Sequence, residues 1–232
     1  MPPTGLKPYG IFAAGDVMTK IKICGIRSLD DVAIINDCMP DYIGYVFAPS
    51  KRQISLNTAI ALSANVFRGI KKVGVFVNQP IDFLVSAITS GAVDFVQLHG
   101  DETAEYEKKL FAALKNSGIE QPEKRCIRAF RIRNKDDIEK TKSTMCATLL
   151  LDAYSEKAVG GTGETFDWTL INNIEKPFFL AGGISIDNAE DAVNSAHPFA
   201  LDVSSSLETN SKKDRAKVEA FVKKSQGIIT VS

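Results

Sequence analysis

Two residues in this sequence each end an apolar run and could move a proton. Cys24 closes the run at 21–24, where a nearby cation or peptide dipole can lower the pKa of its thiol enough for base chemistry. Asp152 follows the run at 148–151, and a carboxyl group kept protonated by a low-dielectric site can donate to a leaving or ring oxygen. The pair predicts a general base and a general acid. The alternatives are an inert core cysteine and an aspartate that caps its loop.

A second feature is a pair of successive strand-to-helix junctions within 178–207. The first strand runs into Gly182 and Gly183, and the second ends in Ser204 and Ser205. Glycines allow a ligand to approach the backbone closely, and the free N–H groups at a helix start carry partial positive charge. Two such junctions in succession predict a site for a phosphate monoester. Taken singly, each junction could be only a turn and a helix cap.

Three more side chains are candidates for contact with the same ligand. Arg52 lies in a long second loop and has a planar guanidinium that suits a substrate carboxylate. His99 and Asp202 lie at strand ends, where Asp202 could bind a sugar hydroxyl or a substrate amine. The alternatives are a solvated charge, a hydrogen-bonded loop histidine and a turn cap. The glycine-rich segment 159–168 suits a flexible cover over a ligand.

The elements that must position these residues alternate between strand and helix. Apolar, β-branched runs repeat eight times, each followed by a helix-like segment, which predicts a parallel sheet closed into a (β/α)₈ barrel. The predicted strands are 21–24, 42–47, 72–77, 94–98, 125–130, 147–151, 178–181 and 199–203. Ser28 is expected to cap the first helix, and the others are predicted near 57–67, 80–90, 101–115, 135–142, 167–172, 187–195 and 213–224. In such a barrel the reactive groups lie at the carboxyl ends of the strands, and the last two junctions are a recurrent phosphate site.

The composition predicts one globular catalytic domain with a short leading segment. The 232 residues are 44% hydrophobic, which is enough for one barrel, over residues 18–232, while residues 1–17 show little periodicity and are expected to be a disordered extension. Lys+Arg and Asp+Glu are both 28, so neither nucleic acid nor a membrane surface is an expected partner. No apolar run is long enough to span a bilayer, which predicts a cytoplasmic protein. Four scattered cysteines and two histidines indicate neither a disulfide framework nor a metal site.

Several motifs together resemble one enzyme family. KICGIRS, GYVFAPSKRQIS, VGVFVN, VQLHGDE, LLLDA with GGTGETFDW, FFLAGGIS and LDVSSSLE occur in this order from Lys22 to Glu208. The pattern is similar to that of phosphoribosylanthranilate isomerase, a (β/α)₈ enzyme of tryptophan biosynthesis. The resemblance implies an Amadori rearrangement of N-(5-phosphoribosyl)anthranilate without a cofactor or metal. The sequence leaves a monomer and a homodimer both open, because the outer helices show no unambiguous dimer surface.

The resemblance also implies roles for particular residues. The cysteine base and the aspartate acid of the family fall on Cys24 and Asp152, and the arginine that contacts anthranilate falls on Arg52. Asp202 is expected beside the anthranilate amine or the ribose. The two glycines and two serines of the successive junctions are expected to hold the phosphate.

Two departures and three alternatives accompany this reading. Ser206 replaces a glycine of the family pattern, so a left-handed backbone there would be strained, and Asn210-Ser211-Lys212-Lys213-Asp214 replaces an expected glycine-lysine-aspartate ending. The alternatives are another phosphosugar isomerase on the same barrel, the histidine-pathway isomerase and a sensor without turnover. The histidine-pathway enzyme would need aspartates where this sequence has Cys24 and Arg131.

Overall fold

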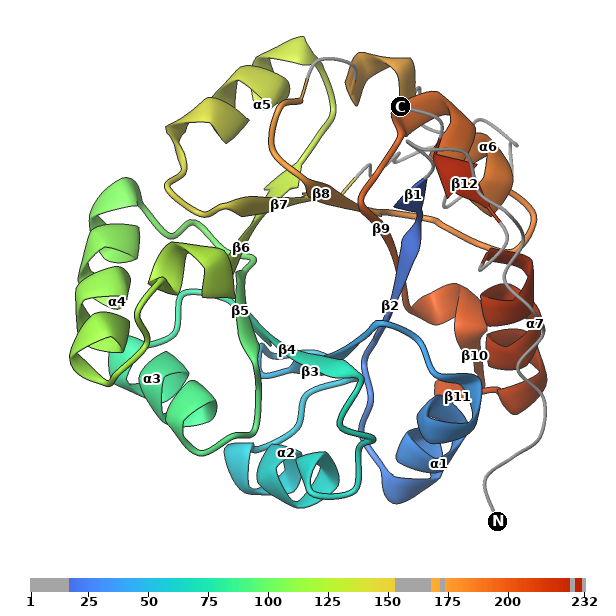
Figure 1. Ribbon diagram of the computed structural model, residues 1–232, viewed down its shortest axis with the longest axis horizontal. Coiled ribbons are helices and arrows are strands. Elements are labelled where there is room, and N and C mark those ends of the chain that lie inside the picture. Colours follow the sequence, from blue (N-terminus) through green and yellow to red (C-terminus); the bar gives the residue numbers. More distant parts are fainter. Residues whose placement is uncertain (1–16, 153–167, 172–173, 226–227, 231–232) are drawn as a thin grey trace.

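Eight parallel strands close into a barrel in which neighbours in the sequence are neighbours in the sheet (Figure 1). The computed structural model describes residues 17–152, 168–171, 174–225 and 228–230. The barrel strands are β2 (Lys20–Cys24), β3 (Tyr42–Val46), β4 (Lys71–Phe76), β5 (Phe95–Leu98), β6 (Cys126–Arg131), β7 (Thr148–Asp152), β8 (Phe178–Ala181) and β9 (Ala200–Val203). Each overlaps a predicted strand, so the (β/α)₈ prediction is confirmed.

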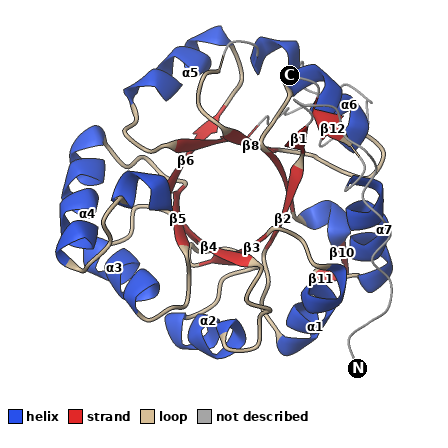
Figure 2. Ribbon diagram, viewed as in Figure 1, coloured by secondary structure: helices blue, strands red, loops and turns tan. Residues whose placement is uncertain are grey.

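Helices surround the outside of the barrel (Figure 2). They are α1 (Leu29–Cys38), α2 (Leu56–Ser63), α3 (Ile81–Thr89), α4 (Ala104–Asn116), α5 (Lys135–Lys140), α6 (Ala189–Ala196) and α7 (Arg215–Ser225). Short 3₁₀ helices are η1 (Pro122–Arg125), η2 (Thr141–Ser143), η4 (Trp168–Ile171) and η5 (Ser205–Leu207). The predicted helix at 167–172 is thus a 3₁₀ turn where the structure describes it. In the described part of the chain, no helix is long and apolar enough to cross a membrane.

Ser28 caps α1 as the sequence predicts, whereas Asn188 does not cap α6 with its side chain. The Ser28 hydroxyl accepts from the Asp31 backbone N–H, and the Asp31 carboxylate accepts from the Ser28 N–H, which confirms the predicted cap of α1. Asn188 stands at the start of α6 without capping it by its side chain. Its amide instead accepts from the Ser185 N–H and donates to the Gly183 carbonyl, so it fixes the loop after β8.

The region after β9 corrects two expectations. Ser206 lies in η5 and has no positive φ, so the predicted left-handed strain is absent there. The left-handed residues are Asn210 (φ 51°) and Ser211 (φ 62°), which form the two-residue turn between β10 (Glu208–Thr209) and β11 (Lys212–Lys213). Positive φ at both central positions matches the right-handed twist of a hairpin. Because β11 takes Lys213, α7 starts two residues later than predicted, at Arg215.

The two ends of the described chain form a small sheet of their own. β1 (Val17–Met18) pairs antiparallel with β12 (Ile229–Thr230). Val17, which the sequence places in the leading extension, belongs to a strand, whereas residues 1–16 lie outside the described residues. The domain boundary at residue 18 otherwise stays a prediction.

The barrel interior is apolar at one end and polar at the other. At the amino ends of the strands, the Tyr42 ring meets Phe95, Phe179 and Phe199 edge to face, with centroid distances of 6.0, 5.2 and 6.3 Å. Such pairs each add about 0.5–1.5 kcal/mol beyond their buried area. In the part of the chain that the structure describes, this packing fills the amino end of the barrel and leaves the carboxyl ends of the strands for a ligand.

Candidate active site

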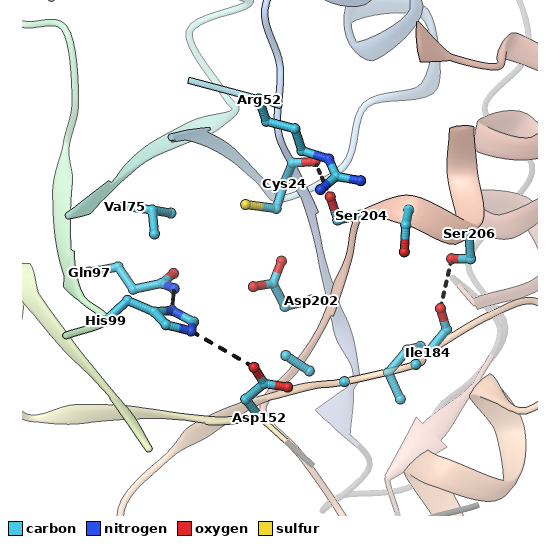
Figure 3. A pocket seen from close by; sticks show the side chains of 14 residues that line it. Cys24, Arg52, Val75, Gln97, His99, Asp152, Ile184, Asp202, Ser204 and Ser206 are labelled. Atoms are coloured by element: carbon cyan, nitrogen blue, oxygen red, sulfur yellow. Dashed lines mark hydrogen bonds and ion pairs between the residues drawn. The ribbon is translucent and has the colours of Figure 1, made fainter. Parts of the chain in front are cut away.

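A cavity of about 540 Å³ lies at the carboxyl ends of the strands (Figure 3). All nine residues predicted for the site line it, namely Cys24, Arg52, His99, Asp152, Gly182, Gly183, Asp202, Ser204 and Ser205. The remaining lining residues are Val75, Gln97, Ala181, Ile184 and Ser206. The sequence therefore identified residues that the fold does bring together, while their roles stay predictions.

Cys24 ends β2 and points into the cavity (Figure 3). Its neighbour in the register is Gly44 on β3, where an added Cβ would lie 2.6 Å from the sulfur, so the glycine makes room for the thiol. The Ser204 hydroxyl donates to the Cys24 carbonyl oxygen over 3.0 Å. Burial raises the pKa of the Cys24 thiol, and the Lys22 cation opposes this rise without cancelling it. A nearby cation, Lys22, does act to lower the pKa of the thiol as the sequence analysis considers, but burial has the larger effect and the pKa is raised.

Lys22 is a member of the site that the sequence reasoning missed. Its side chain is fully buried inside the barrel, and its ammonium donates to Asp202 Oδ2 over 2.7 Å and to Gln97 Oε1 over 2.9 Å. Burial acts to lower the pKa of Lys22, but the Asp202 carboxylate and the Cys24 thiol outweigh it, so that pKa is raised. A lysine inside an apolar strand, two residues before Cys24, was the available signal.

Gln97 and His99 connect this lysine to Asp152. An ammonium only donates hydrogen bonds, so its contact fixes which end of the Gln97 amide is oxygen. Gln97 Nε2 therefore donates to His99 Nδ1 over 2.7 Å, which puts the proton of a neutral imidazole on Nε2. His99 Nε2 lies 3.8 Å from Asp152 Oδ2, and both side chains are on the side of the cavity away from Cys24 (Figure 3).

The two predicted phosphate junctions lie side by side and are tied together. Gly182 and Gly183 have φ values of 93° and 70° after β8, a conformation that side chains rarely adopt. The Ser206 hydroxyl, which the sequence reasoning did not assign to the site, donates to the Ile184 carbonyl oxygen over 2.7 Å. Ser205 is exposed at the start of η5, where the first backbone N–H groups have no acceptor within the helix.

Arg52 is held by residues that the sequence reasoning also missed. Its Nε and Nη2 each donate to Glu208 over 2.7 Å, and Lys213 Nζ donates to the same carboxylate over 3.0 Å. Burial acts to raise the pKa of Glu208, but the bonds from Arg52 and Lys213 lower it to about 2. The guanidinium lies against Gly25, where an added Cβ would come 2.5 Å from Arg52 Cδ.

Some strand-end residues and one segment do not enter the described site. Asn78 and Arg131 are not among the described residues that line the cavity. The Asn78 side chain instead accepts from the Asp101 backbone N–H over 2.9 Å. The predicted cover, 159–168, lies outside the described residues except for its last residue, Trp168, which is buried. Across the described ranges, no group of three His, Cys, Asp or Glu residues is placed to hold a metal ion.

Comparisons with known proteins point to one family. The family model described as N-(5′-phosphoribosyl)anthranilate isomerase matches residues 21–224. The N-(5′-phosphoribosyl)anthranilate isomerase of Caldanaerobacter subterraneus subsp. tengcongensis is 39% identical over 214 residues, which cover 91% of this chain and 100% of the relative.

Two solved structures agree with this match. One is phosphoribosyl anthranilate isomerase in complex with reduced 1-(o-carboxyphenylamino)-1-deoxyribulose 5-phosphate, with a TM-score of 0.74 and 30% identity over 90% of this chain and 100% of that one. The other is a monomeric form of the dimeric enzyme from Thermotoga maritima, with a TM-score of 0.75 and 32% identity over 90% and 100% of the two chains. With its barrel and the match over nearly all of the described residues, the chain belongs to the N-(5′-phosphoribosyl)anthranilate isomerase family.

Proposed function

We propose that this chain converts N-(5-phosphoribosyl)anthranilate to 1-(2-carboxyphenylamino)-1-deoxyribulose 5-phosphate in tryptophan biosynthesis. The observation that carries the proposal is the arrangement of one cavity, in which a thiol and a carboxyl group face the same space beside two glycine and serine junctions. An Amadori rearrangement needs one acid, one base and a hold on the sugar phosphate, and the cavity offers a candidate for each.

The proposed reaction begins at Asp152 and ends at Cys24. Asp152 gives its proton to the furanose oxygen, the ring C–O bond breaks, and the anilino nitrogen forms an iminium. The positive nitrogen acidifies the C2′ hydrogen, which the Cys24 thiolate removes to give an enolamine. The enolamine then tautomerises to the ketone. The iminium charge also favours the thiolate, which offsets the effect of burial on the pKa of Cys24.

The other lining residues supply orientation in this proposal. Gly182, Gly183, Ser204 and Ser205 hold the phosphate, whose binding energy orients the sugar for both proton transfers. Ser204 acts there through its backbone N–H, because its hydroxyl donates its proton to the Cys24 carbonyl oxygen.

Three side chains contact the remainder of the substrate. Arg52 has no acceptor for Nη1 among the described residues, so this group is assigned to the anthranilate carboxylate. Asp202 Oδ1 is buried and receives no hydrogen bond from the described residues, which suits an acceptor for the amine or a ribose hydroxyl. The Nε2–H group of His99 is assigned to the sugar beside Asp152, because this nitrogen lies 3.8 Å from Asp152 Oδ2.

Turnover of freshly made phosphoribosylanthranilate, followed by loss of its fluorescence, tests the proposal. Cys24→Ser and Asp152→Asn are each expected to lower kcat by about 10²–10⁴-fold, because each removes one proton-transfer group. Cys38→Ser, in α1 outside the cavity, is the matched control and should keep the wild-type rate.

The outcomes separate the alternatives. Near-normal rates in both site variants would refute the acid and base assignments while leaving the reaction intact. A wild-type chain that turns over only a histidine-pathway substrate, or binds the phosphoribosyl ligand without turnover, would refute the reaction itself. The cytoplasmic location and the choice between monomer and homodimer stay predictions, and light scattering at several concentrations decides the latter.

A further inference from the structure

Lys22 shares a face of β2 with Cys24. Ile21 and Ile23 pack outward into the core between the sheet and the helices. Successive side chains on a strand point to opposite faces, so Lys20, Lys22 and Cys24 all point into the barrel. Lys22 therefore lies one layer below the thiol, and its side chain has no exposed surface.

Packing alone does not explain a lysine at this position. An ammonium taken out of water loses its hydration, and an apolar side chain of similar size often gives equal or better stability. The fold nevertheless provides Lys22 with a carboxylate at 2.7 Å and an amide oxygen at 2.9 Å. These two acceptors come from β9 and β5, on either side of the barrel, and they keep the lysine charged beneath the site.

The charges that act on Cys24 come from several elements. The charged groups that act on the thiol are Lys22 on the same strand, Asp202 on β9, Lys213 on β11 and Arg52 in the loop after β3. Glu208 is paired with both Lys213 and Arg52. His99 and Asp152 line the same cavity on the side away from Cys24. Among the groups that favour the thiolate, Lys22 has the largest effect. Arg52 and Lys213 already share the Glu208 carboxylate, which reduces their field at the sulfur.

We propose that Lys22 is a positioning residue whose buried charge sets the fraction of Cys24 that is thiolate, with Asp202 holding Lys22 in its charged form. The consequence for turnover rests on the proposed function, in which Cys24 is the base. The electrostatic effect on the sulfur does not rest on it and can be measured without substrate. Asp202 thus has two oxygens with two uses, Oδ2 for Lys22 and Oδ1 for the cavity.

The rate of Cys24 alkylation by iodoacetamide against pH tests the proposal, because only the thiolate reacts. The measurements use the full chain with Cys38→Ser, which removes the other partly exposed thiol, and peptide mass spectrometry to locate the adduct. Lys22→Met should raise the midpoint of the rate profile by about 1 pH unit or more. Lys22→Arg, which keeps the charge, should stay close to the parent profile.

Lys20→Met is the matched control. It removes a charge from the same face of β2, but one layer further from Cys24, where Lys20 lies over the rings of Tyr42 and Phe199. Its midpoint should equal that of the parent. If Lys22→Met does not fold, the double variant Lys22→Met with Asp202→Asn buries no unpaired charge and should still show a raised midpoint, because the effect of Lys22 exceeds that of Asp202.

The results distinguish an electrostatic role from a structural one. A loosened barrel would raise the alkylation rate at every pH, whereas the proposal requires a lower rate near neutral pH and an unchanged plateau. A midpoint at or below the parent value in Lys22→Met, or in the double variant with Asp202→Asn, overturns the proposal. Loss of turnover in Cys24→Ser is a separate result that tests the proposed function, so the two can fail independently.

Discussion

At the scale of residues, the site depends on charges whose partners are far apart in the chain. Arg52 and Glu208 are separated by 156 positions, and Lys22 and Asp202 by 180. Each pair holds a side chain of the cavity in one orientation. Glu208 is expected to affect stability most among these residues, because it pairs with the buried Lys213 as well as with Arg52.

Glu208→Gln should lower the free energy of unfolding by about 3 kcal/mol at neutral pH, because the pKa of this carboxyl group falls from its ordinary value of 4.5 to about 2. A carboxyl group whose folded pKa is depressed stabilises the fold above its unfolded pKa, and this stabilisation disappears as the pH falls through the folded value. The difference between the two proteins should therefore shrink from about pH 4.5 to about pH 2. Urea unfolding across this range measures it.

The control for this prediction is a carboxylate that is exposed to solvent. Glu219→Gln removes an exposed carboxylate that pairs with Arg215 on the surface of α7, so its unfolding free energy should stay near the parent value. A Glu208→Gln deficit that does not change with pH would mean that the loss comes from packing rather than from charge.

The sequence predicts some residues of the site and not others, for a physical reason. Cys24 and Asp152 could be predicted because a polar residue that ends an apolar run lies at the mouth of a barrel. Lys22 was visible only as a lysine inside an apolar strand. Its role and that of Glu208 could not be predicted, since a buried charge is explained only by a partner that the fold brings to it. Strain at Ser206 depended on a left-handed backbone there, and the structure has none, because the residue lies in the 3₁₀ turn η5.

At the scale of elements, strand register makes room for the thiol. Cys24 on β2 is paired with Gly44 on β3, and both face the interior. The order of the strands was predictable from their spacing and apolar composition. The register was not, because it depends on contacts between whole strands, and neither was the β10–β11 hairpin, which takes Lys213 from a predicted helix into the site.

Gly44→Ala should leave a folded protein with kcat/KM lowered by about 10²-fold. The new Cβ would lie 2.6 Å from the sulfur, so the thiol must move away from its position in the cavity. Gly74→Ala is the matched control, since its Cβ would meet the Phe76 ring at 2.6 Å on β4. It should reduce stability without changing the alkylation rate of Cys24. A fully active Gly44→Ala enzyme would show that the sulfur position is not critical.

At the scale of the whole molecule, the aromatic packing and the cavity lie at opposite ends of the barrel. Aromatic rings fill the amino end, and buried charges and glycines line the carboxyl end. Alternation of strand and helix was enough to predict this polarity, because parallel strands put all their carboxyl ends together. The filling of the closed end was not predicted, since Tyr42, Phe95 and Phe199 come from separate strands and loops that only closure brings into contact.

Tyr42→Leu tests whether the two ends are independent. The substitution removes three edge-to-face contacts at the centre of the aromatic cluster and should lower the free energy of unfolding by about 1–3 kcal/mol. Because Tyr42 lies two residues below Gly44, at the amino end of β3, kcat/KM should stay within about twofold of the parent value at temperatures where the protein is folded. Cys24→Ser should show the converse, a stable chain whose kcat is lowered by about 10²–10⁴-fold. A large loss of kcat/KM in folded Tyr42→Leu would mean that packing at the closed end determines the geometry of the thiol, and that the barrel acts as one coupled unit.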